Sequence, residues 1–374
     1  MKVLFVDDEP RVLEAIQRML FDAAGNWQVE TAVSGSEALE KLAKAPFDVI
    51  VTDMRMPGMD GAALLSEVHA LYPSMTRIVL SGQTEQEHAF RALGTAHQFL
   101  SKPCSPKMLT EVVENAFYLR ALTPNRRVAE LASAVQRLPP MPRIHNKILE
   151  LIGSPTGSLR DAADLVAQDP GLTAKVLRIV NSAFFARGQV VRDVRTAVSR
   201  LGLDLLHALV LTERAASGVP VAKLEKMQRA ALASATLACR MVTPDEQRTA
   251  YTAALLCDIG TLVLEQGAPD ELAAVREHAE EFMVPLHIAE KELLGSSHAD
   301  VGGYVLGLWG VPPVIVDAVL GHHELPKSAT PITAAVYIAH QIVSGDVVDQ
   351  HALTRVSQVV NLDALREAFL KDAA

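Results

Sequence analysis

The chain has 374 residues, of which 49% are hydrophobic, and a formal net charge of −9 from 35 Lys and Arg against 44 Asp and Glu. This length predicts two domains, and the negative charge argues against a nucleic-acid-binding protein, which normally carries a basic face. Three irregularly spaced cysteines indicate a reducing compartment, and since we find neither an 18-residue apolar run nor a signal peptide, we expect a cytoplasmic protein without membrane insertion.

Residues 1–122 alternate short apolar runs with stretches of helical periodicity. This alternation predicts a parallel sheet wrapped by helices, a doubly wound α/β domain of the flavodoxin-like type. We expect strands over 2–6, 49–52, 78–80 and 98–100. The first helix should run from Pro10 to Phe21, because Pro is favoured at a helix start, and the fifth should run from about 105 to 122.

Polar side chains follow each of these four strands. Asp7 and Asp8 follow the strand over 2–6, and Asp53 follows the strand over 49–52. Ser81 follows the strand over 78–80, and Lys102 comes shortly after the strand over 98–100. The carboxyl ends of the strands in an open α/β sheet form the ligand-binding edge. Two carboxylates beside Asp53 can hold Mg²⁺, and the metal, Lys102 and Ser81 can neutralise phosphoryl oxygens. The sequence therefore predicts a pocket in which Asp53 is the phosphoacceptor.

The second half of the chain is helical throughout. Three prolines within residues 139–142 cannot lie inside a helix, so we place the domain boundary there, after a helical connector over 123–137. Asp169-Pro170 predicts a helix start, and Gly202 fits a helix C-terminal cap. We expect an all-α domain over 138–345 and a helical tail over 346–374.

The motifs VDDEP, VTDMRMPGMDG, VLSG and FLSKP occur in this order, and residues 1–122 resemble the receiver domain of two-component response regulators. The resemblance implies that Asp8, Asp53 and the backbone carbonyl of Arg55 ligate Mg²⁺, with Asp7 assisting through water. It also implies that Phe99 is a switch aromatic that moves inward after phosphorylation. The alternatives are an acidic-rimmed flavodoxin-like domain without phosphorylation, and a Phe99 that is only a strand-edge aromatic.

Residues 138–340 resemble the HDOD output domain, a relative of the HD phosphohydrolases. The resemblance is carried by LPPMP at 138–142, QDPGLTAKVLRIVNSAFF at 168–185 and TAVSRLGL at 196–203. It implies an all-α HD-like fold. Later segments, LLCDIG at 255–260, HADVGG at 298–303 and HHE at 322–324, are also similar to metal-ligand segments of HD and HD-GYP enzymes.

Several ligand positions of an HD hydrolase are altered in this chain. The early helix around Arg229 contains no His, Cys257 stands where the His of the His-Asp pair is expected, and His340 stands at the distal Asp position. We therefore expect a degenerate HD site without a cofactor, because lost partners weaken metal binding. Its residues are Cys257, Asp258, His298, His322, His323 and His340.

Each of these residues has an alternative interpretation. Asp258 can cap a buried helix end, the histidines can be relics in a polar groove, and Cys257 can be a small buried hydrophobe. A remodelled Zn²⁺ site from Cys257, Asp258, His298, His322 and His340 is a further alternative.

We interpret the chain as a response regulator that a sensor histidine kinase phosphorylates on Asp53. Its output is expected to be protein–protein contact with an unknown downstream protein, and a phosphorylation-dependent homodimer is an alternative. The main alternative is a phosphorylation-regulated, metal-dependent HD phosphohydrolase acting on a cyclic or other nucleotide. Direct DNA binding conflicts with the charge balance and is not expected.

Overall fold

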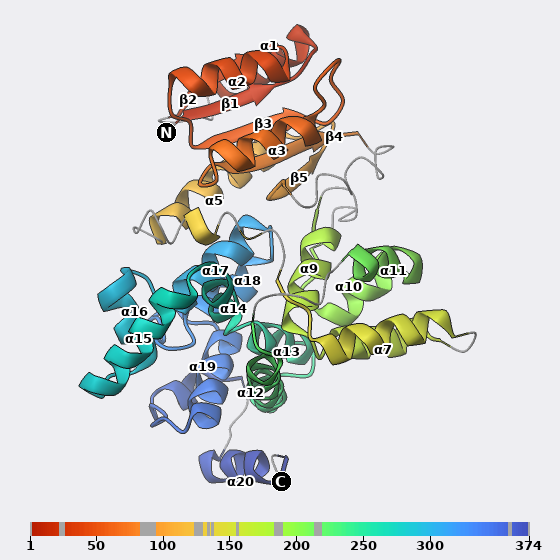
Figure 1. The fold of residues 1–374 in the computed structure, drawn as a ribbon. Coiled ribbons are helices and arrows are strands. Elements are labelled where there is room, and N and C mark those ends of the chain that lie inside the picture. Colours follow the sequence, from red (N-terminus) through yellow and green to blue (C-terminus); the bar gives the residue numbers. More distant parts are fainter. Residues whose placement is uncertain are drawn as a thin grey trace.

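The computed structural model describes residues 2–21, 27–82, 95–122, 130–132, 135, 138–154, 157–182, 190–212, 219–357 and 361–372. An α/β domain stands on a larger all-α domain, with helix α5 at the boundary between them (Figure 1). The fold class is therefore the expected one. Among the described residues, no helix combines the length and apolar character needed to cross a membrane.

The α/β domain contains one sheet of five parallel strands in the order β2-β1-β3-β4-β5. The predicted strands agree with the observed ones to within two residues at either end, and the first helix has the predicted bounds. The elements are β1 (Lys2–Val6), α1 (Pro10–Phe21), β2 (Gln28–Ala32), α2 (Gly35–Lys44), β3 (Val49–Asp53), α3 (Gly61–Leu71), β4 (Thr76–Ser81), β5 (Gln98–Ser101) and α5 (Pro106–Leu122).

Alternate side chains of the strands serve two separate cores, because successive residues of a strand point to opposite faces. Val3 and Phe5 of β1 pack with apolar side chains of α1 and α5. Leu4 and Val6 pack on the other face with side chains of α2 and α3. The helices thus cover both faces of the sheet and leave its carboxyl edge to the polar residues.

The all-α domain is assembled around one large apolar cluster. Asp169 caps α9 by accepting a hydrogen bond from the Leu172 N–H, and Gly202 ends α10 at φ 81°, as predicted. Its elements are α7 (Pro142–Gly153), α8 (Leu159–Val166), α9 (Pro170–Val180), α10 (Val194–Leu201), α11 (Leu203–Thr212), α12 (Val221–Cys239), α13 (Gln247–Leu255), α14 (Ile259–Gly267), α15 (Pro269–Phe282), α16 (Leu286–Leu294), α17 (His298–Leu308), α18 (Pro313–Leu320), α19 (Pro331–Ser344), the 3₁₀ turn η1 (Ala352–Arg355) and α20 (Leu362–Asp372).

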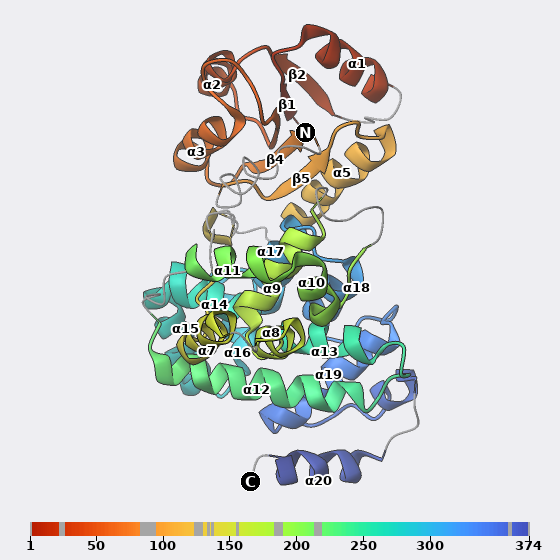
Figure 2. The same ribbon diagram turned by 90° about the vertical axis from the view of Figure 1, so that its right-hand side faces the viewer.

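The two domains meet where α5 and β5 rest on α17 and α9 (Figure 2). Leu119 of α5 is 1% exposed and belongs to the apolar cluster of the all-α domain. Gln98 of β5 donates a hydrogen bond to the Gly307 carbonyl of α17 at 3.2 Å. The guanidinium of Arg178, at the end of α9, donates to the Ala96 carbonyl and lies 5.0 Å from the Trp309 ring centroid. The β5–α5 face of the α/β domain is therefore a docking surface within the chain.

The helical connector expected over 123–137 falls largely outside the described residues. Within that connector, residues 130–132 are helical.

Candidate functional site

The carboxyl edge of the sheet brings together the predicted phosphoacceptor and a cation. Asp53 ends β3 and is 7% exposed, and Asp7 follows β1 and is 2% exposed. Lys102 contacts both carboxylates through its Nζ, which lies 2.7 Å from Asp7 Oδ2 and forms an ion pair with Asp53 Oδ1. The backbone N–H of Arg55 donates to Asp53 Oδ2 at 2.9 Å. Lys102 and this N–H hold the Asp53 carboxylate in one orientation.

Burial and charge act in opposite directions at this site. Burial raises the pKa of Asp53, and the nearby Asp7 charge adds to this, although Lys102 counteracts both. Burial by itself would lower the pKa of Lys102, but its hydrogen bonds and ion pairs with Asp53 and Asp7 outweigh that effect and raise it. Lys102 is therefore held as a cation beside Asp53, where a phosphoryl group would bring more negative charge.

The remaining predicted residues lie around the same edge. Ser81 ends β4, is buried and is in register with Ser101 of β5. Asp8 is half-buried and adjoins Asp7. Phe99 is 3% exposed and packs in the core beneath α2 and α3. The Phe99 side chain therefore points into the core. Its role as a switch stays a prediction, and so does the assignment of the Mg²⁺ ligands.

The close approach of α3 to this edge depends on Gly61. A Cβ atom at Gly61 would overlap the backbone oxygen of Asp53. Because glycine has no Cβ, α3 can start directly behind the phosphoacceptor strand, with Asp60 capping the helix through the Ala63 N–H.

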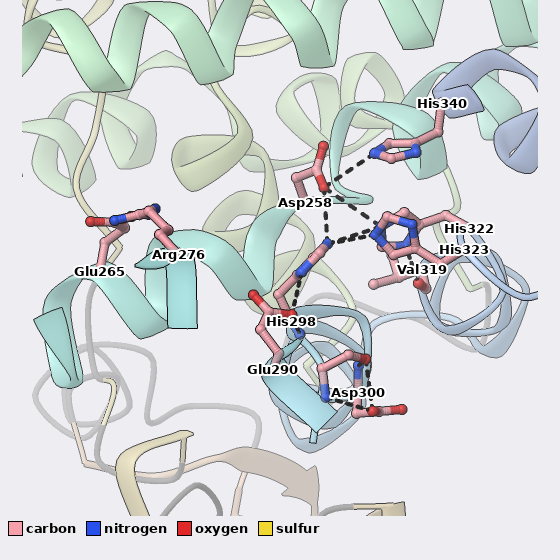
Figure 3. A network of polar contacts seen from close by, with 11 residues as sticks. Asp258, Glu265, Arg276, Glu290, His298, Asp300, Val319, His322, His323 and His340 are labelled. Carbon is pink, nitrogen blue, oxygen red and sulfur yellow. Dashed lines mark hydrogen bonds and ion pairs between the residues drawn. The ribbon is translucent and has the colours of Figure 1, made fainter. Parts of the chain in front are cut away.

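A second polar cluster lies inside the all-α domain, and Figure 3 shows its side chains pointing toward one another. Asp258 precedes α14, His298 begins α17, and His340 lies in α19. His322 and His323 follow α18 after its C-cap residue Gly321. Asp258 Oδ1 lies 3.4 Å from His298 Nε2, 3.5 Å from His322 Nε2 and 3.6 Å from His340 Nε2. His323 Nε2 is 2.8 Å from His298 Nε2. Five of the six residues predicted for a degenerate HD site therefore converge.

Close packing of α14 on α17 brings Asp258 and His298 together. A Cβ atom at Gly260 would overlap the His298 backbone oxygen, and one at Gly302 would lie 3.0 Å from the Gly260 nitrogen. The two glycines therefore allow the helix starts to touch. Asp258 occupies the N-cap position of α14 but its side chain makes no capping hydrogen bond. The capping interpretation of Asp258 is wrong, because its carboxylate faces the histidines instead.

Glu290 of α16 also belongs to this cluster and was not among the residues predicted from the sequence. Its Oε2 accepts from the His298 backbone N–H at 2.7 Å and lies 2.6 Å from His298 Nδ1. The signal in the sequence that could have identified Glu290 was an acidic residue within a helix that packs on the core. Burial opposes protonation of His298, but Glu290 and Asp258 raise its pKa to about 10. His298 is thus an imidazolium between two carboxylates.

Two other rings of the cluster have pKa values shifted in the opposite direction. Burial lowers the pKa of His322 to about 4, and burial together with neighbouring imidazoles lowers that of His323. Burial also raises the pKa of Cys257 well above the ordinary thiol value, and its Sγ lies 3.7 Å from Asp258 Oδ2. Cys257 is therefore a buried thiol behind the cluster.

Four residues of the cluster are placed to hold a metal ion. Asp258, His322, His323 and His340 each offer a ligand atom, and these atoms all lie within 4.8 Å of one another. Asp258, His323 and His340 border a cavity of about 640 Å³ that is also lined by Lys223, Lys226 and Arg276.

Comparison with known protein families gives a match for each of the two domains. A family model described as response regulator receiver domain matches residues 3–114, and one described as HDOD domain matches residues 138–325. The chain belongs to the HDOD family and is a response regulator in which a receiver domain precedes the HDOD domain.

Several relatives share parts of this architecture. The hydrogenase transcriptional regulatory protein HoxA of Cupriavidus necator is 37% identical over 122 residues, which are 32% of this chain and 25% of HoxA. YesN of Bacillus subtilis, an uncharacterized transcriptional regulatory protein, is 29% identical over 55% of this chain and 64% of its own length. The chain thus spans between a quarter and about two thirds of these relatives.

One solved structure similar to this chain is the MmoQ response regulator of Methylococcus capsulatus. It has a TM-score of 0.51 and 21% identity, covering 62% of this chain and 98% of that chain. At this identity the likeness supports the fold alone. Receiver domains in general take phosphoryl groups from histidine kinases and bind Mg²⁺.

Proposed function

We propose that a sensor histidine kinase phosphorylates this protein on Asp53, with Mg²⁺ held by Asp8, Asp53 and the Arg55 backbone carbonyl and assisted by Asp7 through water. The observation that carries the proposal is the ion pair of Lys102 with Asp53 at the carboxyl edge of the sheet. Mg²⁺ supplies positive charge at the phosphoryl oxygens when bound. Lys102 orients the carboxylate and neutralises charge there, and Ser81 is the hydrogen-bond donor on the neighbouring strand.

The output, in this proposal, is a change in how the HDOD domain contacts other proteins. The β5–α5 face of the receiver lies against α17 and α9, so a shift of Ser81 and Phe99 would reach the docked surface through movement of β5. Phosphorylation can move the domains only by as much as it favours one arrangement over the other. Released surface is then available to a downstream protein or to a second copy of this chain, in a cytoplasmic setting.

The HDOD domain acts here as a binding module without hydrolase activity. Helix α12 contains no His, and Cys257 is a buried thiol in the place of a metal-binding imidazole. Metal-activated water needs fixed ligands and an open coordination position.

The phosphoacceptor assignment is tested by Asp53→Asn, with Asp60→Asn as the matched control. Asp60 lies in the same loop and caps α3, and Asn is an equally good cap. Incubation with acetyl phosphate and Mg²⁺ should label the wild type and Asp60→Asn but not Asp53→Asn. Stoichiometric labelling of Asp53→Asn would refute the assignment.

The convergence of four metal-binding side chains favours one alternative, a metal-dependent phosphohydrolase. Assays with cyclic dinucleotides and cyclic mononucleotides, in the presence of added divalent metal, distinguish the two functions. We expect no turnover. Turnover that disappears in Asp258→Ala would establish the hydrolase instead.

A further inference from the structure

Three imidazoles and one carboxylate of the HDOD domain are spaced as the ligands of a tetrahedral metal ion. With metal–ligand distances of about 2.0–2.2 Å, neighbouring ligand atoms of a tetrahedral site lie roughly 3.3–3.6 Å apart. Asp258 Oδ1 is 3.5 Å from His322 Nε2 and 3.6 Å from His340 Nε2. His323 completes the set, and all four ligand atoms lie within 4.8 Å of one another. Small side-chain adjustments therefore suffice to close the site.

The hydrogen bonding of His322 turns its Nε2 toward the same place. His322 Nδ1 lies 2.6 Å from the Val319 carbonyl oxygen, which can only accept a hydrogen bond. Nδ1 must therefore carry a proton, so Nε2 is the ring atom that faces the cluster, 3.5 Å from Asp258 Oδ1 and 3.3 Å from His298 Nε2 (Figure 3). A backbone carbonyl that fixes the ring in this way is a common outer partner of metal-bound histidines.

We infer that the HDOD domain binds one zinc-type transition-metal ion between Asp258, His322, His323 and His340. Three imidazole nitrogens and one carboxylate suit Zn²⁺, whereas Mg²⁺ prefers oxygen ligands. Four protein ligands close a tetrahedral site, which is the arrangement of structural rather than catalytic zinc. The ion joins the start of α14, the end of α18 and the middle of α19, and this inference does not depend on phosphorylation of the receiver.

His298 and Glu290 form the outer support of this site. His298 Nδ1 is tied to Glu290 Oε2, and its Nε2 lies 3.4 Å from Asp258 Oδ1. A proton on His298 Nε2 would orient the Asp258 carboxylate toward the ion. From the sequence we expected no cofactor here, and the alternative zinc set contained Cys257. The geometry replaces that thiol with His323, because Cys257 is fully buried behind Asp258.

The test is metal binding by the full chain, purified without a polyhistidine tag. The protein is stripped with chelator, equilibrated with Zn²⁺ in a large excess of Mg²⁺ to occupy the receiver, and freed of unbound metal by gel filtration. Elemental analysis should find one zinc ion per chain in the wild type. His323→Ala should lower the zinc affinity by more than the ~10–100-fold that loss of an outer-shell partner costs.

His278→Ala is the matched control, because His278 pairs with Glu292 on the outside of α15 and does not border the cluster. It should retain zinc as the wild type does. His323 lies at the half-buried rim of the cluster, and circular dichroism checks that its variant is folded. Zn²⁺ should also raise the thermal midpoint of the wild type and of His278→Ala but not of His323→Ala. Absence of zinc from the wild type, or equal affinity in wild type and His323→Ala, would overturn the inference.

Discussion

Leu119 offers the sharpest test of the docking between the two domains. It lies on α5 of the receiver, but its side chain is 1% exposed within the apolar cluster of the HDOD domain. Leu119→Ala removes three carbon atoms from this contact, worth about 2.4 kcal/mol at ~0.8 kcal/mol per buried carbon. The cavity left behind adds to this, and buried Leu→Ala changes cost about 2.7–5.0 kcal/mol. We take about 2.7 kcal/mol as the loss of docking free energy.

This loss corresponds to an approximately 100-fold larger population of undocked molecules. Hydrogen exchange measures that population, because amides protected by docking exchange through the opened state. Backbone amides of α17 at the boundary, around Gly307, should therefore exchange roughly 100-fold faster in Leu119→Ala than in the wild type. Small-angle scattering should show the corresponding gain in extended molecules.

Leu109→Ala is the matched control on the same helix. Leu109 is also 1% exposed, but it packs within the receiver core against the sheet. It should destabilise the receiver by a similar amount and leave exchange in α17 unchanged. Unchanged α17 exchange in Leu119→Ala, or equal acceleration by both substitutions, would refute the proposed docking role.

Three further predictions concern single side chains. Asp8→Ala should lose Mg²⁺ affinity and phosphorylation together, because too few oxygen ligands remain. Labelling by acetyl phosphate that survives in this variant, or in excess chelator, would contradict the role of the metal. Phe99→Ala should leave phosphorylation intact but abolish any change that beryllofluoride produces in sedimentation or small-angle scattering, and a preserved change would contradict the switch role. Burial raises the pKa of Asp169 to about 6, so its stabilising contribution is complete below pH ~4 and is lost as the pH rises through about 6. Between pH 4 and pH 7 the free energy of unfolding of the wild type should fall by about 3 kcal/mol relative to that of Asp169→Asn. Urea denaturation measures both free energies, and an equal pH dependence in the two proteins would contradict this.

Local sequence patterns determined the fold class and most of the receiver site. In a parallel sheet all strands end at one edge, so Asp7, Asp53 and Lys102 had to meet once their strands were recognised. The observed contacts of Lys102 with both carboxylates agree with this geometry. The predicted domain boundary rests on an equally local signal, because the closely spaced prolines within residues 139–142 cannot lie inside a helix, and its position stays a prediction.

Tertiary structure alone decided what the HDOD cluster contains. Its ligand candidates lie on segments separated by up to about eighty residues, and helical periodicity says nothing about which helix starts meet. The packing of Gly260 against α17 brings Asp258 to His298, and the buried Glu290 joins them from α16. Substitution patterns indicated lost ligands, whereas the spatial arrangement shows that His323 can take the place of Cys257.

The domain interface has the same physical basis. Arg178 lies in a helix that is buried over nearly its whole length, and nothing in its local pattern distinguishes it from a core residue. Its guanidinium reaches the Ala96 carbonyl only because α9 ends against the receiver. The hydrophobic periodicity of a single helix or strand determines which of its faces is buried. Which other element packs against that face depends on long-range contacts that form only in the complete fold.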